Sequence, residues 1–224
     1  MEREIRVGFV GAGNMAAALI RGLLSQGTVS AGCVWVSSPS GPRRAIVESG
    51  VHCTKDNAEV CRNVDVLILC VKPYVMSSAL ESLRGALKPS TLVISVAAGI
   101  SLAQMASMLG GGTWRLVRVM PNTPAAIGHG ASAICLGSYA KPSDAELATR
   151  LFQAVGTVEV VGEAMMDGEL RSFWGAACHH TLPACSLASA SSPPIPPHTH
   201  TPLLCARSCH WPVWLWPCLR VHVH

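Results

Sequence analysis

A short glycine-rich turn near the start of the chain constrains the fold more than any other feature. Residues 7–10, Val-Gly-Phe-Val, form an apolar run that is too brief for a helix and predicts a buried parallel strand. Residues 15–24 have the alanine content and apolar spacing of a helix. The turn between them reads GAGNMA over residues 11–16, which is the G-x-G-x-x-A pattern of dinucleotide-binding turns.

Each small residue of this turn has its own steric role. Gly11 permits the sharp change from strand to helix, Gly13 lets a diphosphate approach the main chain, and Ala16 lets the helix lie close to the strand. The free N–H groups and the positive dipole end of the helix would face the phosphates. The pattern is weak alone, but a strand precedes it and a helix follows, so we predict a dinucleotide site rather than an ordinary glycine-rich turn.

Strand-like and helix-like segments alternate along the chain as far as residue 161. This order predicts a Rossmann-type α/β fold with a doubly wound, mostly parallel sheet. The expected strands are residues 7–10, 33–36, 51–53, 64–71, 91–96, 114–120, 127–136 and 158–161. The expected helices are residues 15–24, 42–49, 56–61, 76–87, 101–109 and 142–155, the last opened by a capping box of Ser143 and Glu146, and another helix begins near Glu163.

Composition narrows the class of protein. The 224 residues carry a net charge of +4 that is scattered rather than clustered, which argues against a nucleic-acid-binding surface. The charged first residues lead directly into the first strand and leave no secretory segment, so we expect a soluble, cytoplasmic protein. Five cysteines lie singly in apolar or strand-like settings, which is typical of buried reduced thiols: Cys33, Cys53, Cys61, Cys70 and Cys135.

The composition changes near residue 170. From Arg171 to His224 there is no Asp, Glu or Lys, and Pro193 to Pro197 interrupts any helical period. We therefore predict a domain at residues 1–170 and a low-complexity, disordered tail at residues 171–224. The apolar residues 211–219 are too few and too interrupted by proline to cross a membrane. A zinc site is not expected, because the possible tail ligands lack a C-x-x-C pair: His198, His200, Cys205, Cys209 and His210.

The end of the second expected strand indicates which cofactor is preferred. Enzymes that prefer NAD usually place Asp or Glu there, and such a carboxylate would repel a 2′-phosphate. This chain has Ser37 and Ser38, followed by Arg43 and Arg44, which suit a phosphate. We predict NADP(H) in preference to NAD(H), although the two arginines could instead be solvated surface residues.

Two further strand ends are candidate site loops. Val71, Lys72 and Pro73 follow the clearest buried strand, where ligands of open α/β sheets gather, although Lys72 fits a solvated strand end equally well. Asn122 and Thr123 lie between two prolines, which predicts a rigid loop with projecting polar side chains. Two other histidines have non-catalytic interpretations: His52 is structural, and the glycine-flanked His129 is an exposed loop residue rather than a general acid.

Four segments in this order resemble pyrroline-5-carboxylate reductases: GFVGAGNMA from Gly8, CVKP from Cys70, SVAAGIS from Ser95 and RVMPNTP from Arg118. The resemblance covers roughly residues 5–169 and implies reduction of 1-pyrroline-5-carboxylate to L-proline, the last step of proline biosynthesis, by an NADPH-dependent oxidoreductase. It implies that Asn122 and Thr123, the expected catalytic residues, lie with Pro124 beside the nicotinamide and that Glu163 approaches the substrate. Together with Ser37, the expected cofactor contacts are Val10, Gly11, Ala12, Gly13, Asn14, Met15, Ser38, Asn57, Val71, Lys72, Pro73 and Ala98.

The resemblance stops where the composition changes. In the family, a C-terminal helical domain supplies donors for the substrate carboxylate and forms homo-oligomers, and no Gly- and Ser-rich turn introduces such a domain after Leu170. Two functions therefore stay open: the reductase with impaired turnover, and a non-catalytic NADP(H)-binding fragment of it. A β-hydroxyacid reductase is a weaker third option, because the lysine-bearing helix that it needs after the last strand is not present. Small molecules are the only partners expected.

Overall fold

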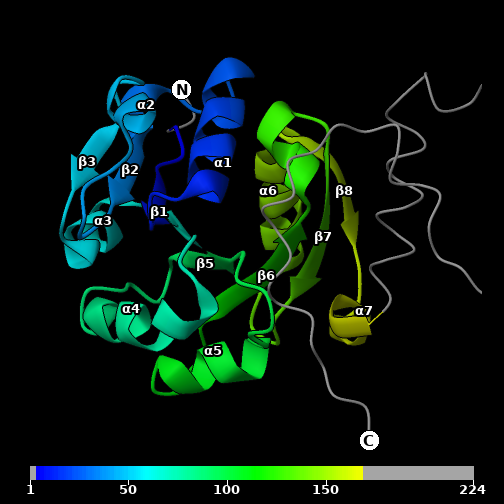
Figure 1. The fold of residues 1–224 in the computed structure, drawn as a ribbon. Helices are drawn as coiled ribbons and strands as arrows, with labels where there is room; N and C mark the ends of the chain where they lie inside the picture. Colours follow the sequence, from blue (N-terminus) through cyan, green and yellow to red (C-terminus); the bar gives the residue numbers. More distant parts are fainter. Residues whose placement is uncertain (1–3, 169–224) are drawn as a thin grey trace, which may run out of the picture. The chain divides into compact units, whose positions relative to one another are not determined.

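The computed structural model describes residues 4–168, which form one eight-stranded sheet covered by helices (Figure 1). The strand order is β3-β2-β1-β4-β5-β6-β7-β8, and β1 to β6 are parallel. β7 is antiparallel to β6, and β8 is parallel to β7. The predicted mostly parallel α/β fold is confirmed. The strands are β1 Val7–Val10, β2 Val34–Ser37, β3 His52–Thr54, β4 Val66–Leu69, β5 Leu92–Ser95, β6 Arg115–Pro121, β7 Gly130–Leu136 and β8 Gly156–Val160.

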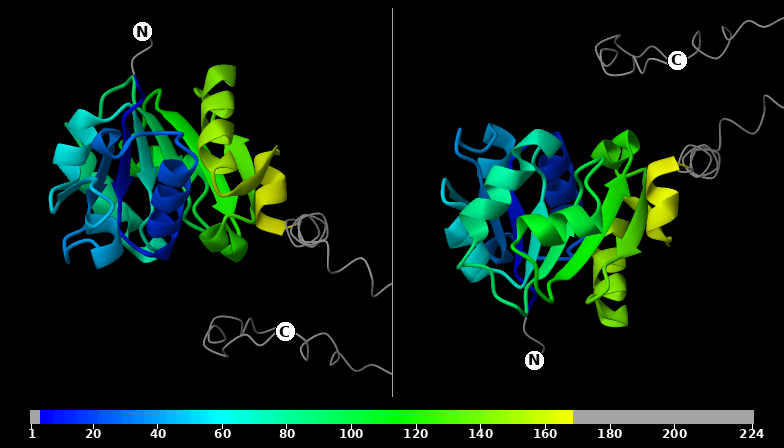
Figure 2. Two further views of the ribbon diagram at one scale, coloured as in Figure 1. Left: turned by 90° about the horizontal axis from the view of Figure 1, so that it is seen from above. Right: turned by 90° about the horizontal axis from the view of Figure 1, so that it is seen from below.

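Helices cover both faces of this sheet (Figure 2). Buried side chains of α1, α2 and α6 pack on one face, and those of α3, α4 and α5 pack on the other, joined by Met166 of α7. Such coverage explains why the central strands are apolar on both sides. The α-helices are α1 Asn14–Ser25, α2 Arg44–Val47, α3 Asn57–Asn63, α4 Met76–Leu83, α5 Leu102–Met108, α6 Pro142–Gln153 and α7 Glu163–Gly168, and the 3-10 helices are η1 Ala31–Cys33, η2 Pro73–Val75 and η3 Thr123–Ile127.

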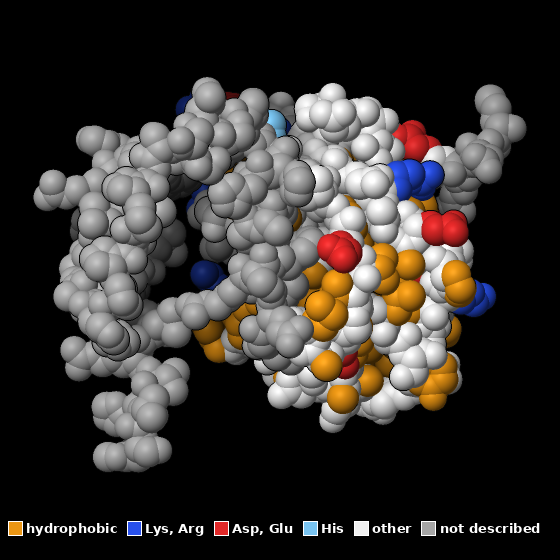
Figure 3. Space-filling model, turned by 90° about the vertical axis from the view of Figure 1, so that its right-hand side faces the viewer, with side chains coloured by type: hydrophobic (Ala, Val, Ile, Leu, Met, Phe, Trp, Pro, Cys, Tyr) orange, Lys and Arg blue, Asp and Glu red, His pale blue; other side chains and the backbone are white. Residues whose placement is uncertain are grey.

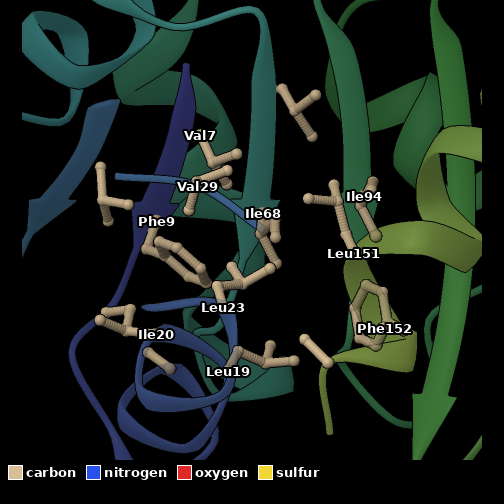
Figure 4. Close-up of a cluster of buried hydrophobic side chains, with 14 of the residues drawn as sticks. Val7, Phe9, Leu19, Ile20, Leu23, Val29, Ile68, Ile94, Leu151 and Phe152 are labelled. Carbon is tan, nitrogen blue, oxygen red and sulfur yellow. The ribbon is translucent and has the colours of Figure 1, made fainter. Parts of the chain in front are cut away.

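Successive side chains of each strand point to opposite faces of the sheet, so the buried residues form two layers. Phe9 of β1 and Ile68 of β4 point toward Leu23 of α1, in the layer that α6 completes with Phe152 (Figure 4). On the other face of β1, a Cβ added to Gly8 would lie 2.6 Å from Val60 Cγ1 of α3. Glycine is therefore required at this strand position because α3 packs directly against the backbone of β1.

Several predicted boundaries are wrong in detail. The helix expected at residues 42–49 is limited to Arg44–Val47, and the one expected at residues 76–87 ends at Leu83. The capping box of Ser143 and Glu146 is not formed, because the N-cap residue of α6 is Lys141, two residues before Ser143. Asp144 closes this end instead: its Oδ2 accepts a hydrogen bond from the Lys141 main-chain N–H at 2.9 Å.

The five cysteines of residues 4–168 are free thiols. Cys61 and Cys135 are buried as predicted, and Cys33 and Cys70 are half-buried. The prediction is wrong for Cys53, which is exposed because β3 is the edge strand of the sheet. None of the helices between residues 4 and 168 has the length and apolarity needed to span a bilayer. The predicted tail and its histidines and cysteines lie outside the described residues.

Candidate functional site

The turn between β1 and α1 requires glycine at its first position. Gly11 has φ +98°, and a Cβ there would lie 2.7 Å from the carbonyl oxygen of Cys70. The Gly11 N–H donates to the carbonyl oxygen of Ser37 at 2.9 Å, which ties the turn to the end of β2. The steric role predicted for Gly11 follows from both its backbone conformation and its close neighbours.

The start of α1 is open to an anion. Gly13 is the N-cap residue, it is exposed, and no atom of the described residues lies within 4 Å of the position of an added Cβ. Within the described structure, no side chain caps this helix and its first turn has no acidic residue. Ala16 is fully buried against the sheet, as predicted. The first-turn amides and the helix dipole therefore remain available to a negatively charged group.

The loop after β2 places its two arginines differently. Arg44 pairs with Glu48 at 2.6 Å, and both side chains are largely exposed, so Arg44 belongs to the solvated surface. Arg43 instead lines a cleft beside α1. Ser38 is buried, and its hydroxyl oxygen lies 3.3 Å from that of Ser40. Of the two guanidinium groups predicted to suit a phosphate, only that of Arg43 lies at the candidate site.

This cleft has a volume of about 530 Å³ and joins elements that are far apart in the sequence. One wall is a single face of α1, where Asn14, Ala17, Ala18 and Arg21 are spaced as on one side of a helix. The opposite wall is the end of β6 and the start of η3, which packs against α1. The structure therefore brings the predicted residues Asn14, Met15, Asn122 and Thr123 together with Arg43.

The loop after β6 is held rigidly at this wall. Asn122 Oδ1 accepts from the Ala131 N–H at 2.8 Å, and the Asn122 N–H donates to the Ala131 carbonyl oxygen at 3.1 Å. These bonds commit the amide oxygen of Asn122 to β7 and leave its Nδ2 group as the donor for a ligand. Thr123 is exposed, and Pro124 lies in the first turn of η3. The predicted rigidity comes from both the prolines and the Asn122 bonds.

Arg21 is a cleft residue that the sequence reasoning missed. Its Nη1 donates to the carbonyl oxygen of Ala126 at 3.3 Å, which links α1 to η3. The signal that could have identified it is the spacing of Arg21 seven residues after Asn14, on the same helix face.

The ends of β4 and β5 lie at the same sheet edge but do not line the cleft. A Cβ at Gly11 would lie 3.1 Å from Val71 Cγ1, so Val71 is adjacent to the glycine turn. Lys72 and Pro73, which precede and begin η2, are exposed, as is Ala98 after β5. Burial raises the pKa of the nearby Cys70 thiol to about 12, so this group stays protonated and unreactive beside the turn.

Glu163 lies apart from the cleft. Its Oε1 accepts from the Leu102 N–H of α5 at 2.7 Å and lies 3.6 Å from Nη1 of Arg118, which is 1% exposed. Glu163 lines a separate pocket of about 210 Å³ with residues of α5 and the segments around Trp114 and Tyr139. In the described structure this carboxylate anchors α7 to α5 and is not brought together with Asn122 and Thr123.

Comparison with known proteins agrees with this fold. Residues 6–99 match the family model described as NADP oxidoreductase, coenzyme F420-dependent. The pyrroline-5-carboxylate reductase of Methanosarcina acetivorans is 40% identical over 169 residues, which are 75% of this chain and 62% of that protein. The Escherichia coli K12 protein of the same name is 33% identical over 165 residues, 73% of this chain and 61% of its own length. The chain thus spans about 60% of the length of these curated relatives.

A solved structure shows the same architecture. The crystal structure of the pyrroline carboxylate reductase of Plasmodium falciparum with NADP bound has a TM-score of 0.69 and 26% sequence identity, over 79% of this chain and 64% of that one. In sequence and in fold, the chain is therefore similar to pyrroline-5-carboxylate reductases over about 60% of their length.

Proposed function

We propose that this chain binds NADP(H) at the turn between β1 and α1 and reduces 1-pyrroline-5-carboxylate to L-proline. The observation that supports this best is the cleft, which joins the open start of α1 to the loop of Asn122 and Thr123. The activity named for the relatives supports the reaction, and the NADP bound to the Plasmodium falciparum protein supports the cofactor.

The residues at the turn fit a dinucleotide phosphate. The diphosphate would be held by main-chain N–H groups from Gly13 to Met15, because Gly13 has no side chain and the space around it is open. Arg43 supplies a positive charge suited to a 2′-phosphate, and Arg44 is already paired with Glu48. We therefore propose NADP(H) rather than NAD(H) as the preferred cofactor. The further proposed contacts are Val10, Gly11, Ala12, Ser38, Asn57, Val71, Lys72, Pro73 and Ala98.

In this reaction the main task of the protein is to orient the hydride donor and the imine relative to each other. Bound NADPH supplies a hydride, and a protonated cyclic imine is already a good electrophile. Asn122 Nδ2 and Thr123 Oγ1 are the donors that we propose to orient the reacting groups, because the loop that carries them is fixed to β7. A strong general acid is not required by this scheme.

Two measurements on one preparation test the proposal. NADPH binding is followed by fluorescence, and NADPH oxidation is followed by absorbance after addition of pyrroline-5-carboxylate. We expect saturable binding and substrate-dependent oxidation, both of which weaken for NADH. Replacing Thr123 by Ala should lower turnover and leave NADPH binding nearly unchanged. Absence of NADPH binding in the parent chain would contradict the proposal at its first step.

A second function is favoured by the length of the match. Because the chain spans only about 60% of its curated relatives, it could hold the cofactor without forming the substrate pocket that the family resemblance assigns to a C-terminal helical domain. The same experiment separates the two functions: saturable NADPH binding without substrate-dependent oxidation supports a cofactor-binding fragment.

A further inference from the structure

Both ends of the Asn57 carboxamide are held by serine hydroxyls from different elements. Asn57 is the first residue of α3. Its Oδ1 accepts from Ser37 Oγ, at the end of β2, at 2.6 Å. Its Nδ2 donates to Ser82 Oγ, in α4, at 2.9 Å. One side chain thus connects a strand end and two helices at the edge of the sheet where β1 and β2 end.

The direction of these bonds is fixed by Ser82. Its hydroxyl has one proton, and that proton is donated to the carbonyl oxygen of Ala79 at 2.6 Å. Ser82 Oγ can therefore only accept from Asn57, so the Asn57 amide nitrogen must face α4 and its oxygen must face Ser37. The Ser37 hydroxyl alone would not fix the orientation of the Asn57 amide, because a hydroxyl can donate to the amide oxygen or accept from the amide nitrogen. Ser82, which can only accept, removes this ambiguity.

Ser37, Asn57 and Ser82 together form a clamp on the Asn57 carboxamide. Ser37 connects this clamp to the turn between β1 and α1. Its side chain is fully buried, and its carbonyl oxygen accepts from the Gly11 N–H at 2.9 Å. The Ser37 hydroxyl is hydrogen-bonded to Asn57 in the protein interior. We therefore expect it to support the site and not to contact a ligand directly. The half-buried Asn57 is the member of the clamp that can reach a molecule bound at this edge.

We propose that Ser82 is a positioning residue for cofactor binding, acting through Asn57. This inference rests on the proposed NADP(H) function and adds a residue to it. Ser82 and Ser37 hold the carboxamide in one orientation, so that the second N–H of Nδ2 is presented as a donor to the adenosine half of the cofactor. The nicotinamide half lies toward the loop of Asn122 and Thr123 and is independent of the clamp.

The test is Ser82→Ala, with binding of NADPH, of 2′,5′-ADP and of reduced nicotinamide mononucleotide measured on the full chain. We expect the first two affinities to fall about threefold to tenfold, as for one lost hydrogen bond, and the third to stay unchanged. Ser78→Ala is the matched control: Ser78 Oγ, in the first turn of α4, also donates to a carbonyl oxygen three residues earlier, that of Val75 at 2.9 Å, and it has no bond to Asn57. It should leave all three affinities unchanged.

A double-mutant cycle distinguishes positioning from a general loss of structure. In an Asn57→Ala background, Ser82→Ala should cause no further loss of 2′,5′-ADP affinity, and Ser82→Thr, which keeps the hydroxyl, should restore binding in the parent background. Additive losses, equal losses for both cofactor halves, or unchanged NADPH binding by Ser82→Ala would each overturn the positioning role. Absence of NADPH binding by the parent chain would instead overturn the proposed function together with this inference.

Discussion

The parallel part of the sheet, β1 to β6, and the reversed part, β7 and β8 with α6 and α7, differ in the surroundings of their polar side chains. At the ends of β1, β2 and β6, polar groups face an open cleft or an uncapped helix start. Away from these strand ends, arginines of β6 are paired with carboxylates of the helices that precede and follow β8: Arg115 with Asp144 of α6, and Arg118 with Glu163 of α7. We infer that the ends of the parallel strands carry the binding site, and that the two ion pairs of β6 fix α6 and α7 of the reversed part to the sheet.

Chain direction explains this difference. Parallel strands all end at one edge of the sheet, so loops that are distant in sequence meet there. β7 runs back along β6, and β8 follows it in the same direction, so the residues after β8 leave the sheet away from the edge where β6 ends. Glu163 consequently reaches α5 and Arg118 instead of the cleft. The difference can be tested by changing one residue of each part.

The largest effect on stability is expected for Asp144→Ala. Asp144 is 1% exposed and pairs with Arg115, whose Nη1 also donates to the Ser90 carbonyl oxygen. Removing the carboxylate leaves a partly buried guanidinium without its charge partner, which costs about 3 kcal/mol. Urea unfolding should show this loss, and the NADPH affinity of the folded variant should stay within twofold of the parent. A larger loss of affinity would mean that the reversed part of the sheet also supports the binding site.

The opposite pattern is expected for Gly13→Glu. The space around Gly13 is open and its φ of −77° suits any residue, so the melting temperature should hardly change. A carboxylate at the start of α1 would repel the diphosphate, and we expect NADPH affinity to fall about 50-fold or more, which corresponds to about 2.3 kcal/mol. Gly32→Glu is the control, because Gly32 also faces open space but lies in η1. Equal NADPH binding by Gly13→Glu and the parent would remove the turn from the proposed site.

A smaller effect is expected from pH. Burial raises the pKa of Asp144, but hydrogen bonds from Arg115 and the Lys141 N–H and the nearby positive charges outweigh it and hold the pKa below its ordinary value of 3.8. The group therefore stabilises the folded state above its unfolded pKa, and this contribution is lost as the pH falls through the folded pKa. Unfolding free energies of the parent and Asp144→Asn, measured from pH 6 to pH 2.5, should converge at the acidic end. A constant difference across this range would contradict the assigned pKa direction.

The sequence predicted the parallel part of the molecule better than the reversed part. The roles of Gly11 and Ala16 follow from local sterics, because the close neighbours of a strand-to-helix turn are fixed by the fold itself. The pairing of Asn122 with β7 could not be predicted, because it depends on a strand that reverses direction. The burial of Arg118 within β6 was likewise not evident, since a charged residue in an apolar run does not show what its partner is.

The two arginines after β2 show a second limit. Arg43 and Arg44 are adjacent and chemically identical, and composition alone treats them alike. One turn of helix separates Arg44 from Glu48, and this local pair keeps Arg44 at the surface. Arg43, the N-cap residue of α2, lines the cleft instead. The position of each arginine relative to the start of α2 thus distinguishes the two guanidinium groups, which composition alone does not.

The smallest effect is expected for Glu163→Gln, and it tests whether the reversed part of the sheet contributes to the reaction. The amide oxygen of Gln can still accept from the Leu102 N–H, but the charge that faces the buried Arg118 is lost. We expect the unfolding free energy to fall by about 1 kcal/mol, with no change in NADPH affinity. If Glu163 instead acts on the substrate, as the family resemblance implies, stability would be unchanged and the KM for pyrroline-5-carboxylate would rise. That result would require α7 to leave α5 during turnover, because the hydrogen bond to Leu102 holds the carboxylate away from Asn122 and Thr123.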